Sequence, residues 1–146
     1  MTIRLMLADD HRMLREGLRR SMIEEGFDVV GEAQDGVEAV ALAEQLLPDV
    51  ILMDVSMPNC DGVEACRQVK SHGSPSKIVM LTMHADKEVL TNAIRAGASG
   101  YLVKDCSTTE IADAVGMAAN GDTVLSPQLA KSMLDEVRRL DERVQN

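Results

Sequence analysis

Aromatic residues, cysteine and proline are scarce in this sequence. Its 146 residues contain no tryptophan, one phenylalanine, Phe27, and one tyrosine, Tyr101. The core must therefore be built from aliphatic side chains and from the ten methionines, whose flexible, polarizable side chains fill irregular spaces. The length predicts a single domain, and 45% hydrophobic with 27% charged residues is an ordinary globular composition.

The cysteines and the apolar runs indicate the compartment. Cys60, Cys66 and Cys106 are odd in number and include no CxxC pair, which favours free thiols over a disulfide framework or a zinc site. The first residues lack the apolar region of a signal peptide, and no apolar run approaches the ~20 residues that span a membrane. We therefore expect a cytoplasmic protein with no membrane partner.

Positive charge is also in short supply. The 15 lysine and arginine residues stand against 24 aspartate and glutamate residues, a formal net charge of −9. A body with this excess repels phosphate backbones, and the sequence has no basic stripe of the kind that nucleic-acid binders carry. We therefore expect that this chain does not bind DNA by itself.

Short apolar runs alternate with longer segments of helical period. The runs, predicted as strands, cover residues 3–8, 27–33, 49–55, 77–83 and 99–104. The helical segments lie near residues 12–25, 36–47, 62–72, 87–96 and 108–119. This alternation predicts an α/β fold with a parallel sheet, and the nearly continuous apolar runs indicate strands covered on both faces.

The predicted helix boundaries carry their own signals. Asp35, Asp61 and Ser107 each stand three residues before a glutamate, the spacing of a capping box. Three glycines are expected to end helices: Gly26, Gly73 and Gly97.

Acidic residues stand at the ends of two apolar runs. Asp9 and Asp10 follow the first run, and Asp54 closes the third. A carboxylate at the end of a buried strand is costly unless its charge is used. If these strands are neighbours, three carboxylates meet at the sheet edge where ligands of open α/β sheets bind, and they call for a cation. His11 follows the acidic pair and is interpreted as a helix-start residue rather than a metal ligand, because no second histidine lies near it.

The residue types at this edge suit phosphoryl chemistry. Carboxylate oxygens are ligands that Mg²⁺ favours, and an aspartate is a competent nucleophile that forms acyl phosphates. Thr82 and Lys104 stand near the ends of the fourth and fifth runs. The hydroxyl would donate a hydrogen bond to a phosphoryl oxygen and the ammonium would act as a point charge on it. The residues therefore predict phosphoryl transfer to Asp54 with Mg²⁺ as cofactor.

In this order along the chain, the motifs resemble the receiver domain of two-component response regulators. The matching residues are Asp9-Asp10, Asp54 with Met57-Pro58 and Asp61-Gly62, Leu81-Thr82, and Lys104. The resemblance covers roughly residues 2–126 and is closest to the NarL/FixJ (LuxR-type) branch, as Asp9-Asp10-His11 and residues 97–105 and 121–127 indicate. It implies a flavodoxin-like, five-stranded parallel sheet of order 2-1-3-4-5 with helices on both faces. The branch usually lacks the proline that many receivers carry after the lysine, and Asp105 here predicts no cis peptide bond.

The resemblance implies a signalling phospho-acceptor rather than an enzyme that turns over a separate substrate. Asp54 would accept a phosphoryl group from the phosphohistidine of a sensor histidine kinase. Asp10 and Asp54 would bind Mg²⁺ through their side chains, Asp9 partly through water, and Ser56 through its backbone carbonyl.

A switch is implied as well. Thr82 and Lys104 would contact the phosphoryl group, and Thr82 would pair with Tyr101. After phosphorylation Thr82 would move toward the phosphoryl group and Tyr101 would turn inward, a local charge change that biases a bistable element.

The end of the chain predicts a helix that leads out of the domain. We expect the receiver domain at residues 1–126 and a helical linker at 127–146, beginning with Ser126 as N-cap and Pro127 at the first helical position. An a/d spacing joins Ala130, Met133, Val137, Leu140 and Val144. It favours equally a homodimer through a coiled coil and an amphipathic helix lying on its own domain. Members of the branch usually continue into a helix-turn-helix domain, so DNA binding and control of transcription are expected only through a further C-terminal domain.

Other functions fit parts of the pattern. A phosphatase of the haloacid dehalogenase type needs an aspartate two residues after the nucleophile, where this chain has Ser56. A flavin carrier needs a hydroxyl- or glycine-rich loop after the first strand, where the chain has Asp9 and Asp10. A stand-alone receiver in a phosphorelay, and a receiver-like interaction module that is never phosphorylated, stay open as alternatives.

Overall fold

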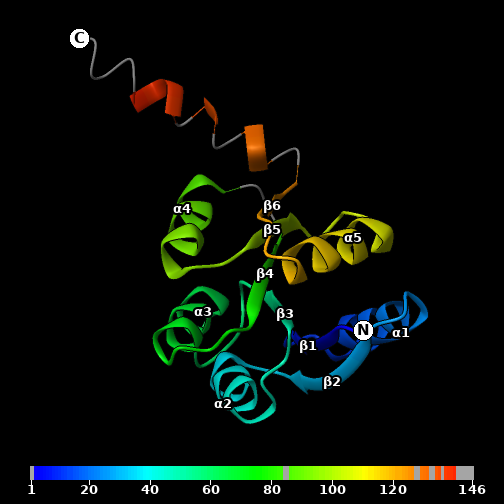
Figure 1. Ribbon diagram of the computed structural model, residues 1–146. Helices are drawn as coiled ribbons and strands as arrows, with labels where there is room; N and C mark the ends of the chain where they lie inside the picture. The colour runs from blue at the N-terminus through cyan, green and yellow to red at the C-terminus, as the bar shows by residue number, and fades with distance from the viewer. Residues whose placement is uncertain (1, 84–85, 127–128, 132–133, 136, 141–146) are drawn as a thin grey trace.

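The chain folds into a parallel sheet with helices on both faces (Figure 1). This computed structural model describes residues 2–83, 86–126, 129–131, 134–135 and 137–140. The strands are β1 (Arg4–Ala8), β2 (Asp28–Ala33), β3 (Val50–Asp54), β4 (Lys77–Thr82), β5 (Gly100–Val103) and β6 (Val124–Leu125). The helices are α1 (Arg12–Glu24), α2 (Gly36–Leu46), α3 (Gly62–Ser71), α4 (Lys87–Ala96) and α5 (Thr108–Ala119). Every predicted strand and helix before residue 120 is confirmed within one residue at each end.

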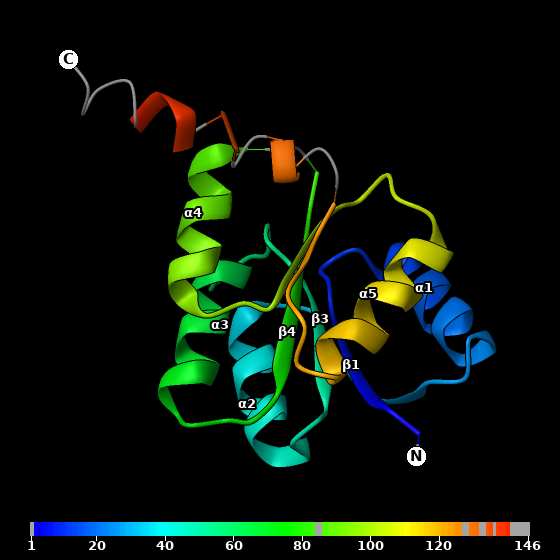
Figure 2. The ribbon, with the colours of Figure 1, turned by 45° about the horizontal axis from the view of Figure 1, so that its top comes forward.

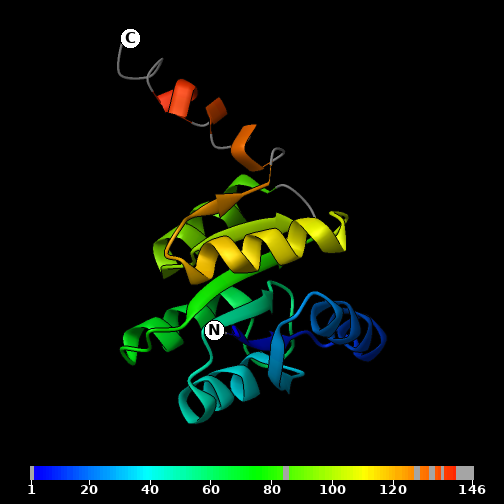
Figure 3. The ribbon, with the colours of Figure 1, turned by 45° about the vertical axis from the view of Figure 1, so that its right-hand side comes forward.

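The sheet has six strands, in the order β2-β1-β3-β4-β5-β6, all parallel. The predicted order is correct for the first five strands, but the prediction of a five-stranded sheet is wrong. After α5 the chain returns to the exposed edge of β5 (Figure 3). There Val124 N–H donates to Ser99 O and Ser126 N–H donates to Tyr101 O, both at 3.0 Å. The added strand is only two residues long, so it leaves no apolar run that a sequence pattern could reveal.

Alternate side chains of each strand face opposite layers of helices. Leu5 and Leu7 of β1 pack in a core with α1 and α5, whereas Met6 and Ala8 pack in a core with α2, α3 and α4. Figure 2 shows these two groups of helices on the two sides of the sheet. Both cores are aliphatic, as predicted, with five buried methionines: Met6, Met22, Met53, Met57 and Met80.

The predicted helix caps are present. The Ser107 side chain accepts from Glu110 N–H, and the Glu110 carboxylate accepts from Ser107 N–H, so both halves of the capping box form at α5. Asp35 and Asp61 accept from the backbone three residues on, the first half of the motif, at α2 and α3. Positive φ angles follow α1, α3 and α4 at the predicted glycines: Gly26 (97°), Gly73 (78°) and Gly97 (96°).

The C-terminal segment is helical where the structure describes it, at residues 129–131, 134–135 and 137–140. It leaves the sheet beyond β6 and passes the end of α4 (Figure 1). Two positions of the predicted a/d pattern, Met133 and Val144, lie outside the described residues. Within the described part, no peptide bond is cis, as predicted after Lys104, and no helix is long and apolar enough to cross a membrane.

Candidate functional site

Two buried carboxylates lie side by side where β1 and β3 end. Ala8 pairs with Met53 in the sheet register, so the residues that follow them, Asp9 and Asp54, are neighbours. Each is 2% exposed. Asp10 lies at the mouth of this site, with its side chain 31% exposed. The structure therefore brings together all three predicted carboxylates, at the carboxyl edge of the sheet.

Backbone groups orient the two buried carboxylates. Asp9 Oδ1 accepts a hydrogen bond from His11 N–H at 2.9 Å, and Asp54 Oδ1 accepts one from Ser56 N–H at 3.2 Å. The turn after β3 closes tightly, because Gly62 N–H donates to Val55 O at 2.8 Å. A Cβ at Gly62 would lie 2.1 Å from Asp54 O, so only glycine fits there.

Lys104 joins the two buried acids. Its Nζ lies 2.9 Å from Asp54 Oδ2 and 3.5 Å from Asp9 Oδ2. The lysine is held in place because its N–H donates to Thr82 O at 2.7 Å, at the shared end of β4 and β5. The ammonium is thus held against one oxygen of Asp54, within reach of Asp9.

Burial and pairing shift the pKa values of this pair. Burial raises the pKa of Asp54 above its usual value, against the opposing hydrogen bond and charge of Lys104. Burial alone would lower the pKa of Lys104, but the hydrogen bond and charge of Asp54, with the charge of Asp9, outweigh it and raise that pKa. Lys104 therefore stays positively charged, and Asp54 keeps an environment in which a further cation is favourable.

The residues present fit a hard divalent cation. Asp9 Oδ2 is buried and, apart from the Lys104 ammonium 3.5 Å away, has no partner among the described residues, so its negative charge is only partly compensated. Ligand atoms of Asp9, Asp10, His11 and Asp54 all lie within 4.8 Å of one another. Three of these four ligands are carboxylates, the donors that Mg²⁺ prefers. The remaining predicted ligand, Ser56, is exposed and lies two residues after the end of β3, where its N–H donates to Asp54 Oδ1.

His11 belongs to this cluster of possible metal ligands, although the sequence predicted only a position at the start of a helix. It occupies the N-cap position of α1, as expected. Its Nδ1 also lies 3.1 Å from Asp10 Oδ1 and 3.4 Å from Asp9 Oδ1. The only sequence signal for this contact is that His11 directly follows the acidic pair.

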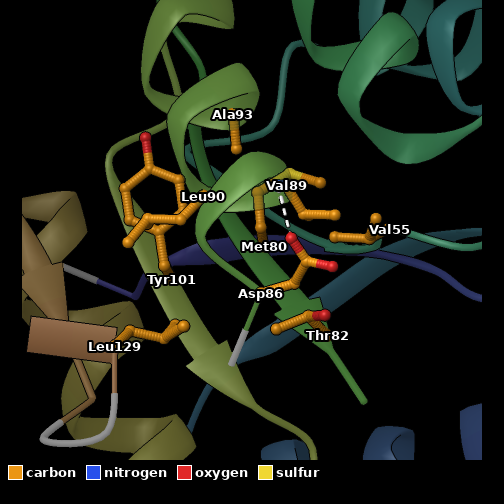
Figure 4. A pocket seen from close by; sticks show the side chains of 9 residues that line it. All are labelled: Val55, Met80, Thr82, Asp86, Val89, Leu90, Ala93, Tyr101 and Leu129. Atoms are coloured by element: carbon orange, nitrogen blue, oxygen red, sulfur yellow. Dashed lines mark hydrogen bonds between the residues drawn. The ribbon is translucent and has the colours of Figure 1, made fainter. Parts of the chain in front are cut away.

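Thr82 and Tyr101 lie on the far side of the site, around a small cavity. Leu81 pairs with Asp54 in the register, so Thr82 ends β4 one residue beyond the level of Asp54. Tyr101 is 3% exposed, in the inward position, and its hydroxyl donates to Ala98 O at 2.9 Å. Burial raises the pKa of Tyr101 well above its usual value. Figure 4 shows both residues on the wall of the cavity, together with Leu129.

Known proteins are similar to this chain in sequence and in fold. The family model described as "Response regulator receiver domain" matches residues 5–116. The transcriptional regulatory protein DegU of Brevibacillus brevis is 38% identical over 139 residues, which are 94% of this chain and 59% of DegU. The transcriptional regulatory protein LiaR of Bacillus subtilis (strain 168) is 42% identical over 96% of this chain and 67% of its own length. The chain thus spans about three fifths to two thirds of these curated relatives.

Solved structures agree with the family match. The signal receiver domain of the putative response regulator NarL from Mycobacterium tuberculosis superimposes with a TM-score of 0.79 at 37% identity, over 82% of this chain and 98% of that one. A LuxR-family two-component response regulator from Aurantimonas reaches a TM-score of 0.87 at 37% identity, over 93% of this chain and 98% of that one. The family model, the relatives of the NarL/LuxR type and the acidic sheet edge with its lysine all agree. This chain belongs to the response regulator receiver domain family.

Proposed function

We propose that Asp54 is the phospho-acceptor of this receiver, and that a sensor histidine kinase is the donor. The observation that carries the proposal is the setting of Asp54: it is buried at the end of β3, paired with Lys104 at 2.9 Å, and lies beside Asp9, a second buried acid that the same lysine contacts only at 3.5 Å. An ion pair that served only stability would need neither a second buried acid nor a position at the edge of the sheet. A phosphoryl site needs the second acid to bind a cation and the edge position to admit the phosphoryl donor.

The transfer step follows from these contacts. A carboxylate oxygen of Asp54 attacks the phosphorus of a phosphohistidine, the P–O bond forms, and the P–N bond breaks with its electron pair going to the imidazole. Asp54 Oδ2 is held by Lys104, and Oδ1 by Ser56 N–H. The Lys104 ammonium can pass from the carboxylate to a phosphoryl oxygen as negative charge grows there. Positioning and electrostatics carry the reaction.

A magnesium ion fits as the cofactor. We propose that it is held by the side chains of Asp9, Asp10 and Asp54 and by the backbone carbonyl of Ser56. When bound, it supplies positive charge to the phosphoryl oxygens. The partly compensated charge of Asp9 Oδ2 and the oxygen-rich donor set support this assignment.

The switch and the output follow from the same site. Thr82 would donate its hydroxyl to the phosphoryl group, and the inward position of Tyr101 would be the one favoured in the phosphorylated state. DegU and LiaR are named as transcriptional regulatory proteins and are longer than this chain. We therefore propose a receiver at residues 1–126, a linker at 127–146, and transcriptional output through a DNA-binding domain beyond it.

The test is phosphorylation by acetyl phosphate with Mg²⁺, read as added mass on the intact chain. Wild type should take up one phosphoryl group and Asp54→Asn none. Lys104→Met should be modified much more slowly, because the charge on the phosphoryl oxygen is lost. Asp113→Asn removes an acid from the exposed face of α5 and is the matched control that should behave as wild type. Equal modification of Asp54→Asn and wild type would exclude Asp54 as the acceptor.

A further inference from the structure

The C-terminal segment is attached to the strand that carries Tyr101. Ser126 N–H donates to Tyr101 O at 3.0 Å, and Ala130 N–H donates to Ser126 O at 2.9 Å. Ser126 is 4% exposed and Leu129 is 1% exposed. Farther along the described segment, Leu134 is 57% exposed. Leu129 is therefore buried, whereas the larger apolar side chains described beyond it, Leu134, Val137 and Leu140, are exposed.

Leu129 enters the cavity that Thr82 and Tyr101 line. The other walls come from the residue after β3, from β4, and from α4 with its N-cap: Val55, Met80, Asp86, Val89, Leu90 and Ala93. In Figure 4 the Leu129 side chain points toward the space between the Tyr101 ring and Thr82. The cavity measures about 10 Å³, and its lining is almost wholly apolar. A cavity that is this small and has an apolar lining is unsuited to holding a water molecule. The side chains around it therefore determine its shape.

This packing ties the position of Tyr101 to that of the segment. The ring is held at one end by the bond from its hydroxyl to Ala98 O, and Leu129 belongs to the same buried cluster as the ring. Protein interiors are close-packed. If Thr82 moves toward Asp54, the other residues that line the cavity must therefore shift to fill the space. Tyr101 and Leu129 both line this cavity, so a change in the space that Thr82 occupies affects the packing of both. An inward Tyr101 and a docked Leu129 therefore favour each other.

We propose that Leu129 is a positioning residue that couples the phosphorylation of Asp54 to the placement of the segment beyond β6. The cavity between β4, β5 and α4 is its docking pocket, and the docked segment is favoured by the phosphorylated state. This inference rests on the proposed function of Asp54. Coupling between two sites is reciprocal. The phosphoryl group strengthens the docking of Leu129, and a docked Leu129 strengthens the binding of the phosphoryl group.

The first experiment measures the effect of Leu129 on the phosphoryl site. The 146-residue chain is titrated with beryllofluoride and Mg²⁺, and binding is followed by the fluorescence of Tyr101, which is the single tyrosine in a chain without tryptophan. Leu129→Ala should bind beryllofluoride about fivefold or more weakly than wild type, the size of a typical coupling between sites. Leu129→Met conserves the volume and should stay close to wild type. Circular dichroism establishes that each variant is folded.

The matched control is Leu134→Ala, the same substitution at an exposed position five residues later. It should leave the affinity for beryllofluoride unchanged. If Leu129→Ala and Leu134→Ala bind equally tightly, Leu129 has no coupling to the site, and the inference is wrong while the proposed function stands. If wild type gives no response, or Asp54→Asn responds as wild type does, the proposed function itself fails.

The second experiment measures the reverse direction by hydrogen exchange. With beryllofluoride, wild type should show slower amide exchange in residues 129–131, where Ala130 N–H bonds to Ser126 O. Leu129→Ala should show fast exchange there with or without beryllofluoride. Unchanged or faster exchange in wild type that demonstrably binds beryllofluoride would overturn the coupling.

Discussion

The pairing of Lys104 with Asp54 shows how one side chain can serve both the unphosphorylated state and the proposed phosphorylated state. In the structure the ammonium contacts both buried acids, at 2.9 Å from Asp54 Oδ2 and 3.5 Å from Asp9 Oδ2. An uncompensated buried carboxylate is strongly destabilising, and this lysine removes part of that penalty. In the proposed phosphorylated state, the same ammonium would lie within reach of a phosphoryl oxygen on Asp54. The stability of the site and its proposed reactivity therefore depend on the same contact.

Cys66 provides a prediction at the residue scale that is independent of the site. It is fully buried in α3, with Sγ 3.6 Å from Ala96 O, and burial raises its pKa from 9.0 to about 11. Between these two values the unfolded chain has released the thiol proton and the folded chain has not. The unfolded state then binds fewer protons, so the free energy of unfolding falls as pH rises from about 9 to about 11.

The measurement compares urea unfolding of wild type and Cys66→Ala at pH 8, 9 and 10. The advantage of wild type over the variant should be constant below pH 9 and should shrink above it, by at most about 1.4 kcal/mol for each pH unit. In the native state at pH 8, Cys66 should also resist alkylation. Parallel stability curves for the two proteins across this range would contradict the assignment.

The start of α3 is packed directly against the end of β3. Gly62 is its first residue, and a Cβ there would lie 2.1 Å from Asp54 O and 2.9 Å from Asp54 C. Because these are backbone atoms, no side-chain rotation can relieve the contact. Gly62→Ala should therefore destabilise the protein by roughly 1–3 kcal/mol, as overpacking does, and should slow the modification of Asp54 by displacing its backbone.

Gly116 in α5 is the matched control for this prediction. A Cβ there meets nothing within 4 Å outside the backbone of its own helix. Gly116→Ala should stabilise the protein by about 0.5–1 kcal/mol, because alanine is the better helix former. Both variants are compared by urea denaturation. Equal stabilities for Gly62→Ala and Gly116→Ala would mean that the helix start is free to shift.

The strands and helices also show which elements a sequence pattern can predict and which it cannot. The apolar runs predicted β1 to β5 within one residue, because burial on both faces leaves a continuous apolar signal. The capping motif at Ser107 was predicted with both of its hydrogen bonds, because it depends on residues three apart. The strand β6 was missed. Its two residues are specified by the open edge of β5, which lies more than twenty residues earlier in the chain.

At the scale of the whole molecule, the cation site should be linked to global stability. A ligand that binds only the folded state stabilises it by about 2.7 kcal/mol at one hundred times its dissociation constant. For a chain of this size, each kcal/mol raises the melting temperature by roughly 2–4 °C. Thermal unfolding of wild type should therefore shift upward with increasing Mg²⁺ and saturate.

Asp10→Asn should remove most of this shift with little effect on the fold, because its side chain is partly exposed at the mouth of the site. Asp113→Asn makes the same change of net charge on α5, away from the site, and should keep the full shift. If all three proteins respond to Mg²⁺ alike, the ion acts through general charge screening and not through the acidic edge.

The alternating elements, the order of the motifs and the acids at the strand ends can all be predicted from the sequence. These are local properties, set by residues within a few positions of one another. Three contacts follow instead from the tertiary fold: Lys104 with Asp54 across fifty positions, His11 with the acidic pair, and Leu129 beside Tyr101. Such contacts depend on which elements the sheet places side by side, and local periodicity does not specify that.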